Sequence, residues 1–436
     1  MYNCQVNVDN QRVENQRLEN HKTAESEEFS VDRISQNVIP EELNLKKKVS
    51  EDRFGEMRRI ILPLGRWYQA NRRDLPWRRE KNPYHTWISE IMLQQTRVEA
   101  VKEYYTKFLL ALPSVRDLAC CPEDRLMKLW EGLGYYSRVR NMQKAAIQIM
   151  NDFGGKIPDD VKTLKTLKGI GDYTAGAIAS IAFGKPQAAV DGNVLRVITR
   201  VLADPSDITR QKYRKEIEDS LTGAMKLELS GSTAENPITP GDFNQGMMDL
   251  GATICLPVGV PKCAECPLLK WCRAHEQGRE MDFPVKSEKK PRRMENRTIL
   301  VVRDGDRVLL NRRPEKGLLA GLYEFPNLEG SLSEEEALNK VKELGLPALY
   351  IRRLEDSRHI FSHIEWQMRG YEIRVGSFPD RLSVGADETS NKKAGAGLFF
   401  AEIDEIRRKY AVPSAYKAYA RALNMNRAGS AGSQKR

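Results

Sequence analysis

The sequence contains few cysteines and histidines, and it lacks an apolar run long enough to span a lipid bilayer. Seven cysteines and five histidines occur among 436 residues. The opening stretch MYNCQVNVDNQRVENQRLEN lacks the basic and apolar segments of a secretory signal, and its acidic, amide-rich character is unlike a transit peptide. We therefore expect an intracellular protein that works in a reducing compartment and does not insert into a membrane.

Four of the cysteines lie close together, in CLPVGVPKCAECPLLKWC at 255–272. A chain with 40% hydrophobic residues can bury its own core, so disulfides are unnecessary, and clustered thiols in a reducing compartment more often bind metal. Zinc sites usually pair two C-x2-C units, whereas this loop has one unit with a single cysteine on each side. The spacing leaves three alternatives open: an iron–sulfur cluster, a zinc site in which His275 replaces one cysteine, or unliganded buried thiols. The four residues are Cys255, Cys263, Cys266 and Cys272.

Acidic residues are outnumbered by basic ones, and this imbalance favours a polyanionic partner. Lys and Arg number 70 against 60 for Asp and Glu, which gives a net charge of +10. Basic runs occur at 71–80 and 286–297, and such runs either contact nucleic acid or form solvated faces and linkers. The polar stretches 1–52 and 426–436 have few aromatic residues and predict disorder.

The length predicts two or three domains, and the patterning divides the chain into a helical region and a smaller α+β region. Helical periodicity extends over 53–254, the cysteine loop occupies 255–280, a charged linker covers 281–296, and strand-rich sequence fills 297–425. Within the strand-rich sequence, β-rich runs flank Asp304-Gly305, the stretch 359–378 alternates like a strand, and helices are expected near 333–345 and 402–425.

Two features of the helical region bear on function. The stretch TWISEIMLQQTRVEAVKEYYTKFLLAL, 86–112, has apolar residues at helical spacing, with Thr86 as a candidate N-cap. Between two helices near 160–183, Gly169 and Gly171 bound a tight turn, and the second helix begins at Asp172. Free N–H groups at such a helix start can bind a backbone phosphate, although the same pattern fits an ordinary helix–helix turn.

Several motifs taken together resemble the helix-hairpin-helix DNA glycosylase superfamily, and within it the MutY-type adenine DNA glycosylases. The resemblance covers 60–275 and, more loosely, 298–420. It implies an all-α helix-hairpin-helix core, a [4Fe–4S] cluster on the four clustered cysteines, and a C-terminal Nudix-like domain. The first cysteine spacer has seven residues here against six in the family, a difference that a loop can absorb. The matching motifs are LPWR, YHTWISEIMLQQTRV, WEGLGYYSRVRN, LKGIGDYTAGAIASIAFG, VDGNVLRVITR, FNQGMMDLGATIC and CAECPL.

The resemblance also implies which residues carry the chemistry. Removing a purine requires an acid that protonates the leaving base and a negative charge near the developing sugar cation. By resemblance, Glu90 is the acid that protonates adenine N7, Asp191 is the carboxylate that stabilises the sugar cation or adds to it, and Asn193 and Tyr173 orient these two. Without the resemblance, Glu90 would be a surface residue of a helix's first turn, with its pKa lowered by the dipole unless burial raised it, and Asp191 a helix cap.

Tyr173 separates two kinds of glycosylase. In bifunctional relatives such as endonuclease III, a lysine at this position forms a Schiff base with the sugar and the strand is then cut. Tyrosine cannot form that imine, and Lys168 lies before the hairpin, off the matching position. We therefore expect base removal without efficient strand cleavage.

A base inside a duplex must be flipped out before it can be excised, and the gap must be filled. By resemblance, Gln95 and Tyr135 are the wedge residues, and Gly169 and Gly171 approach a DNA phosphate. Since adenine is a normal base, specificity must come from reading the opposite strand. In the family a C-terminal Nudix-like domain senses 8-oxoguanine, and FSHIEWQ resembles its reader loop. Its motif positions are Phe361, Ser362 and His363.

The expected partner is therefore double-stranded DNA that contains adenine opposite 8-oxoguanine or guanine, bound by a monomer in the cytoplasm, nucleus or mitochondrion. Three alternatives compete with this interpretation. An endonuclease III-like lyase is disfavoured by Tyr173, and a non-catalytic iron–sulfur DNA-binding protein by the presence of both Glu90 and Asp191. A nucleotide pyrophosphatase is disfavoured because SLSEEEALNKVKELG lacks the R-E-x-x-E-E order that holds magnesium in active Nudix hydrolases.

Overall fold

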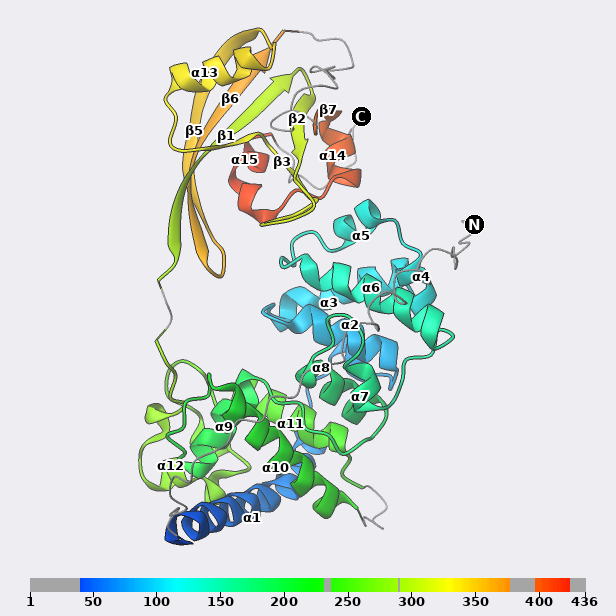
Figure 1. Ribbon diagram of the computed structural model, residues 1–436, viewed down its shortest axis with the longest axis vertical. Helices are drawn as coiled ribbons and strands as arrows, with labels where there is room; N and C mark the ends of the chain where they lie inside the picture. The colour runs from blue at the N-terminus through cyan, green and yellow to red at the C-terminus, as the bar shows by residue number, and fades with distance from the viewer. Residues whose placement is uncertain (1–39, 231–236, 289–290, 377–396, 424–436) are drawn as a thin grey trace, which may run out of the picture.

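A computed structural model describes residues 40–230, 237–288, 291–376 and 397–423. Figure 1 shows a helical domain, α1 to α12, joined by an extended segment to a second domain built on one sheet. The helices are α1 (Pro40–Asn71), α2 (Pro83–Leu93), α3 (Val98–Ala111), α4 (Val115–Ala119), α5 (Glu123–Leu129), α6 (Ser137–Asp152), α7 (Val161–Leu164), α8 (Asp172–Ala177), α9 (Gly192–Leu202), α10 (Gln211–Leu229), α11 (Pro240–Thr253) and α12 (Arg273–Glu276). A π-helical turn, Ile178–Ala182, extends α8. None of the helices within these described ranges is long and apolar enough to cross a membrane.

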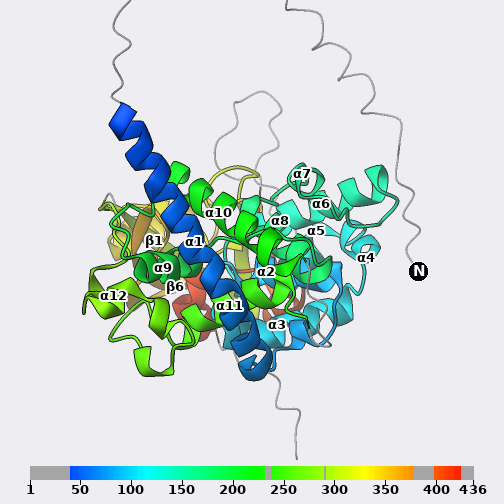
Figure 2. The same cartoon turned by 90° about the horizontal axis from the view of Figure 1, so that it is seen from below.

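The helical domain contains two hydrophobic cores. The first is formed mainly by α2 to α6 and the start of α8, around Trp87, Phe108 and Trp130. The second is formed by α1, α9, α10 and α11, and Figure 2 shows α1 as a long helix lying across α10 and α11. Helix α9 is buried from Val194 to Leu202 and packs into the second core.

The expected long helix over 86–112 is wrong in two respects. Asn82, not Thr86, is the N-cap of α2, because its side chain accepts hydrogen bonds from the N–H groups of Tyr84 and His85 and a proline occupies the first helical position. The chain then leaves the helix after Leu93 and turns at 94–97 before α3 begins. Glu90 consequently lies deep in α2 and not in its first turn.

The predicted hairpin is confirmed. Helix α7 is capped by Asp160, and α8 begins at Asp172. Gly169 has a φ of +80°, and a Cβ there would lie 2.8 Å from the Cβ of Asn141, so both the backbone and the packing require glycine. Gly171 has an extended backbone with φ −95° and open space around it.

The second domain is the predicted α+β unit, and its sheet is mixed. The strands run in the order β3-β2-β1-β6-β5, where β1 pairs with β6 in parallel and the other pairs are antiparallel. Helix α13 covers one face of the sheet, and α14 and α15 cover the other (Figure 1). The elements are β1 (Arg293–Asp304), β2 (Arg307–Arg312), β3 (Tyr323–Glu324), β4 (Asn327–Glu329), α13 (Glu334–Glu343), β5 (Ala348–Ile360), β6 (Ile364–Val375), β7 (Leu398–Glu402), α14 (Ile403–Lys409) and α15 (Lys417–Ala422).

Several boundaries differ from the sequence-based expectation. Strand β1 starts at Arg293, inside the expected linker. The stretch 359–378 is not one strand, because β5 ends at Ile360 and β6 begins at Ile364. The helix expected near 402–425 is interrupted before Pro413, whose fixed φ does not suit a continuing helix. Helix α1 begins at Pro40, within the segment expected to be disordered; the expectation for 1–39 and for the tail 426–436 lies outside the described residues.

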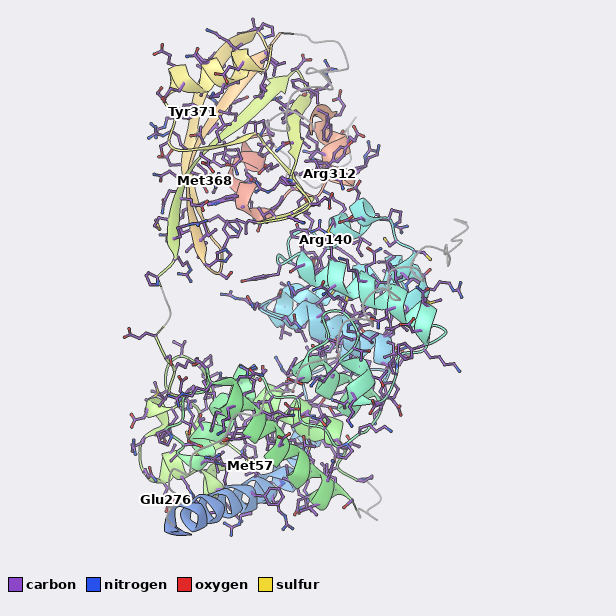
Figure 3. The ribbon with its side chains drawn as sticks, viewed as in Figure 1. Met57, Arg140, Glu276, Arg312, Met368 and Tyr371 are labelled. Carbon is purple, nitrogen blue, oxygen red and sulfur yellow. The ribbon has the colours of Figure 1, made fainter. Side chains whose placement is uncertain are left out.

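The second domain docks directly on the helical domain, mainly on α5 and the turn after it. The Nζ of Lys128 donates to the carbonyls of Ile406 and Tyr410 at 3.2 and 3.1 Å, and the N–H of Val412 donates to Glu131 at 2.8 Å. Leu322 and Ala411 are buried in the first helical core. Figure 3 places the Arg140 side chain at this boundary, and Arg140, near the start of α6, lines a cavity together with Phe361 and Ser362 of the β5–β6 turn.

Candidate functional site

A cavity of about 190 Å³ opens between α2, α8, α9 and α11, and the predicted acid lies in its wall. Glu90 is 4% exposed, and the hydroxyl of Tyr173 donates a hydrogen bond of 2.7 Å to its Oε2. Burial raises the pKa of Glu90 to about 7, against lowering effects of the Tyr173 hydrogen bond and of the Arg78 charge. This carboxyl group can therefore give or accept a proton near neutral pH.

The second carboxylate, Asp191, lines the same cavity and caps α9. Its Oδ1 accepts the N–H groups of Asn193 and Val194 at 2.8 and 2.9 Å, and its Oδ2 accepts Nδ2 of Asn193 at 2.7 Å. Asp191 therefore both caps α9 and lines the cavity. The negative charge of Asp191 also raises the pKa of Glu90.

A cation is buried in the wall beside Glu90. Arg78 forms two hydrogen bonds with Asp249, at 2.7 and 3.0 Å, and its guanidinium lies 5.3 Å from the ring centroid of Tyr68. Asp249 is 1% exposed and also accepts from Arg73. Because Asp249 fixes the position of the Arg78 guanidinium and partly neutralises its charge, the positive charge near Glu90 stays in one place.

Hydrogen bonds connect the Asp191 carboxylate to the cysteine loop. Arg196 donates from Nη2 to Oδ1 of Asn193 at 3.0 Å and from Nε to the carbonyl of Cys255 at 3.0 Å. A Cβ on Gly251 would lie 2.9 Å from that of Asn193, so α11 can approach α9 this closely only with glycine there. The first cysteine of the loop is therefore linked by hydrogen bonds to the wall of the cavity at Glu90 and Asp191.

The four clustered cysteines line a second cavity, and none of the four forms a disulfide. Burial is the main reason that the pKa of Cys263 is raised to about 11 and that of Cys266 to about 12; Glu280 contributes to the rise at Cys263, and the neighbouring cysteines contribute at both. Four partly buried cysteine side chains around one cavity fit a metal group, because bound metal would take the place of the thiol protons. Ligand atoms of Cys263, His275 and Glu280 also lie within 4.8 Å of one another, so the zinc alternative retains a geometric basis.

A third cavity, of about 400 Å³, lies between the two domains. Tyr135 and Arg140 line it from the helical domain, and Phe361 and Ser362 line it from the β5–β6 turn. Phe361 packs edge-on against Trp366 with centroids 4.9 Å apart. Gln95 and His363 are not among the described residues that line this cavity or the one around Glu90.

Eleven of the fifteen predicted site residues thus form three groups: four around the cavity at Glu90, four around the cysteine-lined cavity, and three at the boundary between the domains. Sequence reasoning missed the arginines that support these groups. Arg196 could have been found, because it lies three residues after Asn193 on one face of a helix. The pairing of Arg78 with Asp249 spans 171 residues, and no local spacing rule indicates it.

Comparisons with known proteins find one family model for each of the two domains. Residues 88–222 match the family model described as HhH-GPD superfamily base excision DNA repair protein, and 298–422 match the NUDIX domain. A solved structure, that of a thermostable thymine-DNA glycosylase, superposes with a TM-score of 0.44 and 30% identity, covering 51% of this chain and 98% of that one.

Curated relatives span both domains. The adenine DNA glycosylase of Mus musculus is 36% identical over 371 residues, which is 72% of this chain and 70% of the relative. The Homo sapiens adenine DNA glycosylase is 35% identical over 403 residues, 77% of this chain and 71% of the relative. That of Buchnera aphidicola from Acyrthosiphon pisum is 34% identical over 310 residues, 71% of this chain and 85% of the relative.

Proposed function

Because this chain belongs to the adenine DNA glycosylase family of base excision DNA repair, we propose that its cavity at Glu90 receives an adenine flipped out of duplex DNA and that the base is removed there by hydrolysis. The observation that carries this proposal is the buried Glu90 carboxyl, held by Tyr173 and facing the charge of Asp191. Glycosidic hydrolysis uses two carboxyl groups kept in different protonation states by their surroundings.

The proposed reaction assigns one role to each group. Protonated Glu90 gives its proton to N7 of adenine, so that the base leaves as a neutral molecule and the electron pair of the glycosidic bond goes with it. The ionised Asp191 stabilises the positive charge that develops on the sugar, and Asn193 holds Asp191 in place. A water molecule then adds to the sugar and loses a proton, which leaves an abasic site.

The rate of excision should depend on pH through Glu90. Because burial raises the pKa of Glu90 to about 7, the protonated fraction falls about tenfold per pH unit above that value, and the single-turnover rate should fall with it. Tyr173→Phe removes a hydrogen bond that lowers this pKa, so the decline should begin at higher pH. Rates measured from pH 6 to pH 9 test both statements, and a rate that stays constant over this range would rule out Glu90 as the acid.

We further propose that this chain removes the base without cutting the strand efficiently, because Tyr173 has no amine for a Schiff base. Three labelled duplexes test the reaction: adenine opposite 8-oxoguanine, adenine opposite thymine, and thymine glycol opposite adenine, each incubated with and without hot alkali. Breaks only after alkali, and only in the first duplex, are expected. Breaks without alkali in the thymine glycol duplex would instead indicate an endonuclease III-like lyase.

We propose that the chain is specific for adenine opposite 8-oxoguanine or guanine and that it acts on its DNA as a monomer. The cavity between the two domains supports the proposed specificity. Tyr135 from the catalytic domain and Phe361 and Ser362 from the second domain line this cavity. Aromatic rings can stack on the opposing base, and the hydroxyl of Ser362 can form a hydrogen bond with its edge. The β5–β6 turn then serves as the reader, with His363 beside it.

Phe361→Ala should reduce excision opposite 8-oxoguanine by about 5- to 100-fold, since stacking of a base on an aromatic ring contributes on the order of 1–3 kcal/mol. Excision of adenine opposite guanine should fall less, so that the ratio of the two rates decreases. Tyr350→Ala is the matched control, because Tyr350 is an exposed aromatic near the start of β5, at the end of the strand away from the β5–β6 turn. An unchanged ratio for Phe361→Ala would show that the turn does not read the opposing base.

We propose that the four clustered cysteines hold a [4Fe–4S] cluster, which would supply a rigid link within the loop and not the excision chemistry. The support is the gathering of four partly buried cysteines, none of them in a disulfide, around one cavity. Arg200 donates from Nη1 to the Sγ of Cys255 at 3.2 Å, a contact suited to a thiolate that ligates metal.

Purified protein should contain about four irons per chain and little zinc, measured by mass spectrometry together with the visible absorption of the cluster. Cys266→Ser should lose the iron and the absorption, because serine is a poor ligand for this cluster. Cys121→Ser should keep both, since Cys121 is buried in the first helical core, away from the loop. One zinc per chain and no iron would support the alternative site with Cys263, His275 and Glu280.

A further inference from the structure

The two predicted wedge residues share an uncommon backbone conformation. Gln95 has a φ of +57° and Tyr135 a φ of +47°, and only two other non-glycine residues among those that the structure describes have positive φ. Side chains rarely adopt this conformation unless their surroundings hold it. Gln95 lies in the turn after α2 and Tyr135 in the turn before α6, forty positions apart in the sequence.

One guanidinium group joins these two turns. Arg138, in the first turn of α6, donates from Nη1 to the carbonyls of Ile91, Met92 and Gln94 at 2.7, 3.2 and 2.6 Å. Its Nη2 donates to the carbonyls of Leu133 and Gly134 at 2.9 and 3.1 Å. Nη1 therefore donates to carbonyls just before Gln95, and Nη2 donates to carbonyls just before Tyr135.

The environment of Arg138 indicates that this bridge is its role. Arg138 has no carboxylate partner among the residues that the structure describes, and its Nε is buried without a hydrogen-bond partner there. Its guanidinium lies over the rings of Trp130 and Tyr135, at 5.3 and 5.7 Å from their centroids. The carbonyls from α2 are those of its last turn, where the helix dipole favours a cation.

We propose that Arg138 is a positioning residue that fixes the Gln95 turn and the Tyr135 turn relative to each other, so that both wedges enter the duplex together when the adenine is flipped out. This inference rests on the proposed function, since it assumes that the two residues act as wedges. Lysine could not replace arginine, because one ammonium group presents its donors at a single point and cannot reach carbonyls on both turns.

The test measures base unstacking separately from excision. A duplex with 2-aminopurine in place of the target adenine reports flipping by its fluorescence, in a Glu90→Gln background that cannot excise. Arg138→Lys should reduce the fluorescence increase and, with Glu90 present, slow single-turnover excision by roughly 10- to 100-fold, because a misplacement of about 1 Å has effects of this size. Tyr104→Phe is the control. The Tyr104 hydroxyl donates to the carbonyl of Glu131, just before the Tyr135 turn, and does not connect that turn to the Gln95 turn.

A double-mutant cycle then separates this role from a general loss of stability. If Arg138 acts through the wedge residues, the double variant Arg138→Lys/Tyr135→Ala should excise adenine less than about 2-fold more slowly than Tyr135→Ala alone. If the effects of the two substitutions on the excision rate multiply, the inference is overturned and the proposed function stands. The same holds if the Arg138→Lys protein flips and excises adenine like the parent. A parent protein that neither flips nor excises adenine would overturn both.

Arg138→Gln provides a second variant if the lysine variant does not fold, and each is measured well below its own melting temperature. Should neither variant fold, hydrogen exchange of the parent protein decides the matter. Peptides that contain Gln95 and Tyr135 should then open with one common rate, and unrelated rates would overturn the inference.

Discussion

Glu90→Gln should slow excision strongly and at the same time stabilise the protein at alkaline pH. Loss of the proton donor should lower the single-turnover rate by about 10²- to 10⁴-fold. The pKa of Glu90 in the folded protein, about 7, lies above its ordinary value of 4.5, so between these values the folded state binds more protons than the unfolded state. Stability therefore decreases as pH rises through this window, and the full cost, up to about 3 kcal/mol, is present above pH 7. Glutamine carries no charge, and it removes this cost.

The measurement is the melting temperature of both proteins at pH 5 and pH 8, beside the excision rate. The variant should melt at a higher temperature than the parent at pH 8, and the difference should shrink at pH 5. Glu218→Gln is the control, because Glu218 is also buried in the helical domain but pairs with Lys215 and Gln187. This control should keep its activity and lose stability. A Glu90→Gln protein with more than a tenth of the parent rate would exclude Glu90 as the acid.

The position of Glu90 shows where sequence reasoning goes wrong. With Thr86 as N-cap, Glu90 falls in the first turn of a helix, where the dipole lowers the pKa of a carboxyl group. The sequence KNPYHT in fact contains the better signal, an asparagine followed by proline, which starts α2 at Pro83. Glu90 then lies one turn deeper, and burial dominates its pKa.

Features that depend on neighbouring residues could be predicted. The hairpin follows from the glycines, the start of α9 from the Asp191 cap, and the turn after Asp304 from Gly305, whose φ is +60°. The cysteines could be grouped from their spacing alone, because a single short loop carries all four.

Features that depend on tertiary contacts could not be predicted. Arg138 looks like a surface residue of an amphipathic helix, and only the approach of α2 gives it five carbonyl acceptors. The same holds for Lys128, whose acceptors lie about 280 residues further along the chain. Local patterns do not encode which distant carbonyls a cation will meet.

Asp191→Asn and Asp191→Ala should separate the two roles of this residue. Asparagine is as good an N-cap as aspartate, so Asp191→Asn should change the stability by no more than about 1 kcal/mol, although its amide nitrogen then meets another donor, Nδ2 of Asn193. It nevertheless removes the charge that stabilises the sugar cation, and the single-turnover rate should fall by about 10²- to 10³-fold. Asp191→Ala loses both roles and should cost about 1 kcal/mol of stability in addition to the activity.

Ser114→Ala supplies the matched capping control. Ser114 caps α4 through the N–H of Asp117 and lines neither the active cavity nor the cavity between the domains. Its replacement should cost about 1 kcal/mol of stability and leave the rate within about 2-fold of the parent. If Asp191→Asn keeps the parent rate while Asp191→Ala loses it, Asp191 acts as a helix cap that shapes the cavity, and the charge opposite the sugar must come from another group. If both lose the rate and only the alanine variant loses stability, the activity depends on the charge and the fold depends on the cap.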